Sequence, residues 1–201
     1  MQMNAIKKTC LVGLCFLTAC APPQPASQAP ENITMPVEKR EKQTATVSSW
    51  VVTGAMAAKN QKKSWTASVN WRQQGMNNYQ IRLFGPLGGG TVIIEKHNGV
   101  VTYKDGPKTV TSKNADELLQ QETGIRLPVN NLYYWVRGIP APGAIQSAKY
   151  DQYNHLTYLK QSGYTINYTR YTSVNNIDLP SKMELHGNGV TIKFVIKQWS
   201  V

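Results

Sequence analysis

Apolar and polar side chains alternate strictly in the stretch Trp65-Thr66-Ala67-Ser68-Val69-Asn70-Trp71. A period of two puts every apolar side chain on one face of an extended segment, which is typical of a half-buried antiparallel strand. The same alternation returns at 164–169 and 190–196, where it includes Tyr164, Ile166 and Tyr168 and then Val190 to Ile196. The chain is therefore predicted to be mainly β.

Turn signals separate these segments at short intervals. They are Asn60-Gln61, Gln74-Gly75, Asn98-Gly99, Asp105-Gly106, Ser162-Gly163 and Gly187-Asn188-Gly189. Such pairs favour tight hairpins between consecutive strands. We count about ten strands between Val47 and Trp199, a meander long enough to curl into a barrel or half-barrel.

One region breaks the period of two. Asn114–Gln121 has a capping residue at its start, Glu117 three positions later and Gly124 as a stop, so a helix is predicted. Pro128–Arg137 carries Val129, Leu132, Tyr133 and Val136 at helical spacing and predicts a second. Their apolar faces must cover one face or mouth of the curved sheet, either as a plug that completes a solid core or as a lid over a cavity.

The first residues form a secretion signal. Lys7 and Lys8 precede an apolar run that is too short to span a bilayer, and Leu17-Thr-Ala-Cys20 resembles the bacterial lipobox. We expect 1–19 to be a lipoprotein signal peptide and Cys20 to be acylated after cleavage. The residue after the cysteine is Ala21 and not aspartate. In the enteric sorting rule this favours export of the lipoprotein to the outer membrane.

Residues 20–43 are predicted to be a disordered tether that follows the acylated cysteine, because the segment is rich in Pro, Gln, Ser and charge and lacks any apolar period. Residues 44–201 then form a single domain. Cys10 and Cys15 leave with the signal, so this domain has no cysteine and must be held by its apolar core.

The charge of the chain is +11, and it falls to +9 when Lys7 and Lys8 are removed. The basic residues are scattered singly and show no cluster with aromatic residues, so no nucleic acid partner is expected. A solvated face is the commonest meaning of such charge, and attraction to an acidic protein or to anionic lipid is the functional interpretation.

Catalytic chemistry is not indicated. His97, His155 and His186 are interpreted as isolated, no serine has the context of a nucleophile, and no phosphate loop is present. Glu95 and His97 could hold a metal on one strand face, but two ligands are a weak signal. We expect neither enzymatic activity nor a metal or cofactor.

An unusual loop lies at Phe84-Gly-Pro-Leu-Gly-Gly-Gly90. Pro86 and the glycines favour a tight turn, and Leu87 is a large aliphatic residue at its tip. This leucine either folds back onto the barrel wall or is offered to an apolar partner.

The order of these features resembles the LolB family of outer-membrane lipoproteins. The resemblance covers about Trp50 to Trp199 and is carried mainly by the Gly85-Pro-Leu-Gly88 loop and by Leu132-x-x-Trp135-x-x-Gly138-x-Pro140. Trp50-Val-Val-Thr-Gly54 and Trp71-Arg-Gln-Gln-Gly75 agree with it. The family pattern has Asn before the loop proline, where this chain has Gly85.

The resemblance implies an open, incomplete antiparallel β-barrel of about ten or eleven strands, with short lid helices over a hydrophobic cavity. It implies a monomer, anchored in the outer membrane and facing the periplasm, that accepts acylated lipoproteins from a LolA-type carrier and inserts them into the inner leaflet. Pro86, Leu87 and Gly88 match the loop that passes cargo into outer-membrane lipid. We expect these inward-facing residues to line the acyl-chain cavity: Trp65, Val69, Trp71, Ile81, Leu83, Ile94, Tyr103, Leu118, Leu119, Leu132, Tyr133 and Val136.

Two other classes of function fit parts of the sequence. The first is a structural or assembly lipoprotein with a solid barrel core, whose basic surface docks a protein partner. The second is a small-ligand or glycan-binding module that uses exposed tyrosines.

Overall fold

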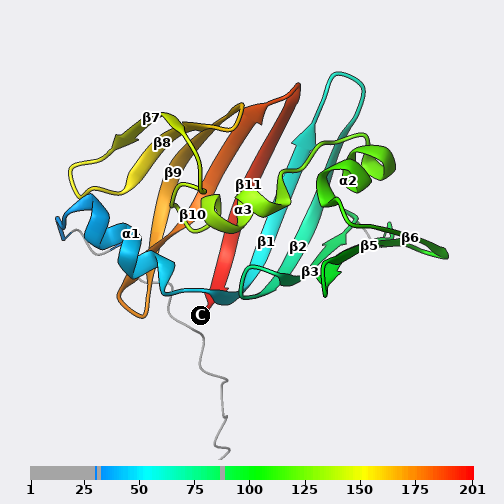
Figure 1. The fold of residues 1–201 in the computed structure, drawn as a ribbon, viewed down its shortest axis with the longest axis horizontal. Helices are drawn as coiled ribbons and strands as arrows, with labels where there is room; N and C mark the ends of the chain where they lie inside the picture. The colour runs from blue at the N-terminus through cyan, green and yellow to red at the C-terminus, as the bar shows by residue number, and fades with distance from the viewer. Residues whose placement is uncertain (1–29, 31–32, 87–88) are drawn as a thin grey trace, which may run out of the picture.

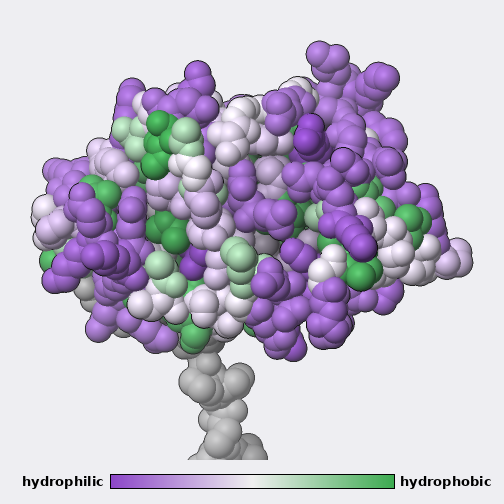
Figure 2. All heavy atoms as spheres, in the orientation of Figure 1, coloured by the Kyte–Doolittle hydropathy of each residue, from purple (hydrophilic) through white to green (hydrophobic). Residues whose placement is uncertain are grey.

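The described part of the chain folds into one 11-stranded antiparallel sheet with three short helices (Figure 1). The face of the molecule shown in Figure 2 is mainly hydrophilic, with apolar residues scattered over it. The computed structural model describes residue 30 and residues 33–86 and 89–201. The strands are β1 (Ser49–Lys59), β2 (Ser64–Gln74), β3 (Asn78–Phe84), β4 (Thr91–His97), β5 (Val100–Asp105), β6 (Lys108–Ser112), β7 (Ile145–Tyr150), β8 (Leu156–Gln161), β9 (Tyr164–Val174), β10 (Ile177–Gly187) and β11 (Val190–Ser200). The predicted open antiparallel architecture is confirmed.

The strand order is β6-β5-β4-β3-β2-β1-β11-β10-β9-β8-β7. Consecutive strands pair with each other except β6 and β7, and at the centre the first strand, β1, pairs with the last, β11. The sheet therefore consists of an N-terminal half, β1 to β6, and a C-terminal half, β7 to β11. Strands β6 and β7 are its two open edges.

The predicted hairpin turns are present. Asn98 and Gly99 have φ of 50° and 79°, as a tight turn of this kind requires, and Ser162, Gly163, Asn188 and Gly189 also have positive φ. The turn at Asn175 and Asn176, with φ of 51° and 62°, was not among the predicted signals. Two asparagines fill this turn, because asparagine tolerates the left-handed backbone conformation.

The pairing of β1 with β11 at the centre of the sheet is irregular. The register shifts between Thr53 and Gly54, as at a β-bulge. A Cβ atom on Gly54 would collide with the carbonyl oxygen of Val195, so only glycine fits this close approach.

Both predicted helices exist and lie between the two edge strands in sequence. Helix α2 (Ala115–Thr123) begins at Asn114, whose side chain accepts hydrogen bonds from the amides of Asp116 and Glu117, and ends at Gly124. Helix α3 is Val129–Trp135. The segment that contains them crosses one face of the sheet from the side of β6 toward the side of β7 (Figure 1). No helix among the described residues is both long and apolar enough to span a bilayer.

The prediction of a disordered tether up to residue 43 was wrong for its last part. Val37–Ala45 forms helix α1, which packs near β10 (Figure 1). The helix is strongly polar, so its sequence lacks an apolar period, and its buried residues are Arg40 and Thr44. Tertiary polar contacts hold it in place, which a search for apolar periodicity does not detect.

Candidate functional site

The apolar residues predicted to line a cavity converge on one face of the sheet, beneath α2 and α3. Eleven of the twelve are buried in a single core cluster, and Trp65 is partly buried and packs against that cluster. Leu118 and Leu119 from α2, Leu132 from α3 and Val136 directly after α3 are at most 2% exposed. The sheet and the helices therefore share one continuous apolar layer.

Aromatic rings occupy the centre of this layer, around Trp50. The Trp50 ring stacks on Tyr133 of α3 with centroids 5.1 Å apart, and it lies 6.0 Å from Trp71 and 6.1 Å from Trp199. Trp50 was not among the predicted cavity residues, although it is an aromatic residue in β1. A sequence signal that could have found it is the spacing of Trp50 and Val52, which are two positions apart and therefore share one face of a strand.

A buried arginine follows α3. The Arg137 guanidinium lies 4.0 Å from the Tyr133 ring centroid and 5.2 Å from that of Trp50. It donates to the backbone carbonyl oxygens of Tyr133, at 2.9 Å, and Val47, at 2.8 Å. Burial lowers the pKa of Arg137, while the neighbouring tyrosines oppose that shift. The arginine thereby connects the end of α3 to the chain just before β1.

Buried hydrogen bonds attach α3 to the C-terminal half of the sheet. Gln161 of β8 accepts from the Trp135 indole N–H at 2.9 Å and from the Ala141 amide at 2.9 Å, and it donates to the Ala141 carbonyl at 2.6 Å. The Tyr168 hydroxyl donates to the Trp135 carbonyl at 2.9 Å. These groups are away from water, so the attachment is costly to break.

Helix α2 is attached differently, over β5 and β6. Its polar links to the sheet are the Asn60 amide, which donates to the Gly124 carbonyl at 2.7 Å, and an ion pair between Glu122 and the exposed Lys108. Its first turn is linked to α3 by the amide of Val129, which donates to Asp116 at 3.3 Å. Helix α2 is thus held mainly by apolar packing and by partly exposed polar contacts.

The interpretation of His155 as isolated was wrong. Its ring nitrogens lie 2.9 Å from Asp151 Oδ2 and 2.8 Å from Asp178 Oδ2, and Arg40 of α1 pairs with the same Asp178 oxygen at 3.0 Å. Both ring nitrogens face carboxylates, so the doubly protonated ring satisfies both contacts. The cluster docks α1 on the body. Sequence could not reveal it because its members lie up to 138 positions apart.

The loop between β3 and β4 is partly described. Pro86 is exposed and its carbonyl accepts from the Gly89 amide, while the Gly85 amide donates to Gly90. A Cβ on Gly85 would lie 3.1 Å from the Gly89 carbonyl oxygen, a tight contact that a small shift of the loop would have to relieve. Leu87, Gly88 and Cys20 lie outside the described residues. Phe84, at the end of β3 beside the loop, is 40% exposed.

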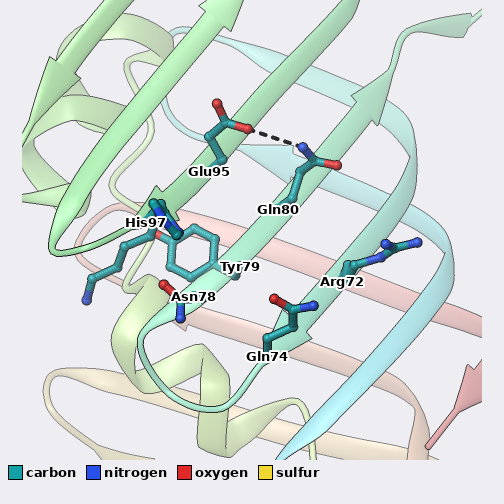
Figure 3. A pocket seen from close by; sticks show the side chains of 8 residues that line it. Arg72, Gln74, Asn78, Tyr79, Gln80, Glu95 and His97 are labelled. Atoms are coloured by element: carbon teal, nitrogen blue, oxygen red, sulfur yellow. Dashed lines mark hydrogen bonds between the residues drawn. The ribbon is translucent and has the colours of Figure 1, made fainter.

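The opposite face of the sheet carries a polar groove of about 460 Å³ (Figure 3). It is lined by Arg72, Gln74, Asn78, Gln80, Glu95, Lys96 and His97, and it also borders on Tyr79, whose side chain is buried on the inward face with Ile81. The Glu95 carboxylate accepts hydrogen bonds from Lys104 Nζ at 2.6 Å and from Gln80 Nε2 at 3.2 Å, and these bonds lower the pKa of Glu95. Among the described residues no group of three or more potential ligands could hold a metal ion.

Comparisons with known proteins agree with this architecture. A family model described as "Outer membrane lipoprotein LolB" matches residues 48–199. The chain belongs to the LolB family. An outer-membrane lipoprotein LolB of Coxiella burnetii (strain RSA 493 / Nine Mile phase I) is 41% identical over 76% of this chain and 72% of the relative. The LolB of Pseudomonas paraeruginosa (strain DSM 24068 / PA7) is 34% identical over 79% and 78%.

Two solved structures share the fold at low sequence identity. A putative outer membrane lipoprotein-sorting protein domain from Vibrio parahaemolyticus superposes with a TM-score of 0.52 at 7% identity, over 82% of this chain and 90% of that one. A LolA superfamily protein from Nitrosomonas europaea gives 0.50 at 7% identity, over 84% and 94%.

Family membership places the protein at the outer membrane as a lipid-anchored lipoprotein of the Lol lipoprotein-localisation pathway. It also supports a receptor role there. The resemblance inferred from the loop and helix motifs is confirmed.

Proposed function

We propose that this LolB protein accepts acylated lipoproteins from a LolA-type periplasmic carrier and inserts them into the inner leaflet of the outer membrane. The acyl chains would lie between the sheet and the helices. The observation that carries this proposal is the convergence of apolar residues from both halves of an open sheet and from two short helices. A buried apolar layer between separable elements is a suitable place for alkyl chains.

The energetics require a protein-bound route. A triacylated cysteine has on the order of 45 CH₂ groups, each worth about 0.8 kcal/mol, so its exposure to water would cost tens of kcal/mol. Cargo must therefore move between apolar sites. Transfer can proceed without ATP provided that the receptor binds the chains at least as well as the carrier and the bilayer binds them better.

Alkyl chains can enter only when a helix moves, because the side chains beneath α2 and α3 are almost fully buried. Helix α2 is the element that we expect to move, since its polar links to the sheet are partly exposed. Helix α3 would remain on the C-terminal half through Gln161 and Tyr168.

An acyl probe tests acceptance. The chain carrying Cys20→Ala is not acylated itself and should bind a fluorescent fatty acyl probe, with quenching of the tryptophans around Trp50.

The tight packing of the core also suits a structural lipoprotein with a solid interior. A protein that binds no acyl probe at any concentration supports that second function instead.

Delivery is assigned to the loop that contains Leu87. Burying one leucine yields about 1.5–3 kcal/mol, too little to anchor a protein, so this side chain would make a brief contact that disturbs the lipid surface. The exposed Phe84 beside the loop adds apolar surface at the same place.

We predict that Leu87→Glu accepts a lipoprotein from the carrier as the wild type does but fails to release it into liposomes. The two steps are scored separately in a transfer assay. Val100→Glu is the matched control, because Val100 is 42% exposed at the start of β5, next to the turn at the other end of the strands. Normal folding with loss of acceptance would assign Leu87 to the cavity.

A further inference from the structure

Three residues with polar groups lie in one row across the N-terminal half of the apolar layer. Trp50 of β1 is directly opposite Gln73 of β2, and Gln73 is directly opposite Tyr79 of β3. All three are buried, at 3%, 2% and 6% exposure. They share the inward face with Trp71 and Ile81, so the row is set among apolar side chains.

The middle member of this row is satisfied and the outer two are not. Gln73 accepts from the Trp71 indole N–H at 2.8 Å and donates to the Gly75 carbonyl at 2.6 Å. The Trp50 indole N–H and the Tyr79 hydroxyl have no hydrogen-bond partner among the described residues. Buried donors are almost always paired in proteins, so two unpaired donors in one row call for a ligand.

The surroundings indicate what these donors can bind. Burial, with the nearby Asp116, raises the pKa of Tyr79 well above its ordinary value, so the hydroxyl keeps its proton and remains a donor. An indole N–H can only donate. The nearest buried cation, Arg137, already donates to two backbone carbonyls. Neutral donors in an apolar site suit an uncharged acceptor better than an anion.

We propose that Trp50 and Tyr79 donate hydrogen bonds to carbonyl oxygens of the ester or amide linkages that join fatty acyl chains to a lipoprotein. This inference rests on the proposed function and names the part of the cargo that the row recognises. The carbonyls are the polar atoms of an acyl anchor, and they need donors once they leave water. Strands lie about 4.8 Å apart, so donors on β1 and β3 are about 10 Å apart along the row, a span over which several linked carbonyls can be distributed.

The test compares an ester-linked ligand with an ether-linked ligand of the same shape. The Cys20→Ala chain is titrated with a dipalmitoylglyceryl-cysteinyl peptide and with its dihexadecyl ether analogue. The wild-type row should prefer the ester. Trp50→Phe and Tyr79→Phe should each weaken ester binding about five-fold, the worth of one neutral hydrogen bond, and leave ether binding unchanged.

Tyr168→Phe is the matched control, because its hydroxyl is already bonded to the Trp135 carbonyl at 2.9 Å. It should lower the stability of the free protein and should not change the ester-to-ether ratio, whereas Tyr79→Phe should not destabilise the free protein. An unchanged ratio in both row variants overturns the inference while acyl binding itself stands. Failure of the wild type to bind either ligand overturns the proposed function as well.

Discussion

The two halves of the sheet differ in how their interiors are held. Eight polar or charged side chains are buried in the described part of the chain: Arg40, Thr44, Gln73, Arg137, His155, Gln161, Ser173 and Asp178. Only Gln73 belongs to the N-terminal half or to α2. The others belong to the C-terminal half or to α1, α3 and the residues next to them.

This difference distinguishes a part of the molecule that is held by buried polar contacts from a part that is held mainly by apolar packing. Buried polar contacts are specific in geometry and costly to break, so they hold α1 and α3 on the C-terminal half. Apolar contacts are not directional, and alkyl chains can replace them with little loss. In the proposed function, this division would let α2 separate from the N-terminal half and admit acyl chains while the rest keeps its shape.

The largest effect is expected from Gln161, the residue that holds α3. Gln161→Leu would leave the Trp135 indole N–H and both backbone groups of Ala141 unpaired in a fully buried site. At about 1–3 kcal/mol for each unpaired group, we expect a loss of roughly 4–6 kcal/mol in the free energy of unfolding. Urea unfolding measures it. A loss below about 1 kcal/mol would show that α3 is held by apolar packing alone.

The strands, turns and the two lid helices could be predicted because their signals are local. Alternation around Trp71, the cap at Asn114 and the stop at Gly124 each act within a few residues of the structure they specify. The pairing of β1 with β11 was not predicted, because it joins the first and the last strand of the chain and no local signal specifies it.

The polar interior of the C-terminal half could not be predicted because its partners are distant in sequence. Arg40 meets Asp178, and Trp135 meets Gln161, only after the sheet has formed. Helix α1 was missed for the same reason. In the candidate site, the apolar lining of the strands could be predicted from the period of two. The row of Trp50, Gln73 and Tyr79 could not, because strand register decides which residues lie opposite one another and the sequence alone does not specify it.

Removal of the arginine in α1 should have the next largest effect. Arg40→Met leaves Asp178 without its guanidinium partner and removes the bonds to the carbonyls of Ile33 and Tyr153. We expect a loss of about 3 kcal/mol, at the lower end for a broken buried pair, because α1 can undock and admit water. Thermal unfolding and hydrogen exchange of the α1 amides measure it, with the exposed Lys39→Met as control. Unchanged protection of α1 would contradict the docking role.

The acidic and basic groups around His155 predict a pH dependence that is specific to the C-terminal half. Burial alone lowers the pKa of His155, but its bonds to Asp178 and Asp151 outweigh burial and raise the pKa above 6.5. Burial raises the pKa of Asp151, but its bonds with His155 and the backbone lower it below 3.8. These contributions to stability are therefore both present between pH 3.8 and 6.5.

As the pH rises through the raised pKa of His155, its contribution is lost, and stability should fall. As the pH falls through the lowered pKa of Asp151, that contribution is lost as well. Urea unfolding across this range measures both limbs, and His155→Gln should flatten the alkaline limb. The assignment of the alkaline limb to His155 would be contradicted if the stability of the wild type rose from pH 6 to 8 and that of His155→Gln rose by the same amount.

The smallest effect is expected at Asn60, where the N-terminal half meets α2. The Asn60 side chain accepts from the amides of Lys62 and Lys63 and donates to the Gly124 carbonyl at the end of α2. Asn60→Ala should cost only about 1 kcal/mol in global stability, because these groups are partly exposed and water can replace the lost bonds. It should nevertheless speed hydrogen exchange in α2 more than in α3, with the exposed Gln61→Ala as control. Equal acceleration of hydrogen exchange in α2 and α3 would mean that the two helices open together as one unit. The contrast between the two halves of the sheet would then describe their stability but not their motion.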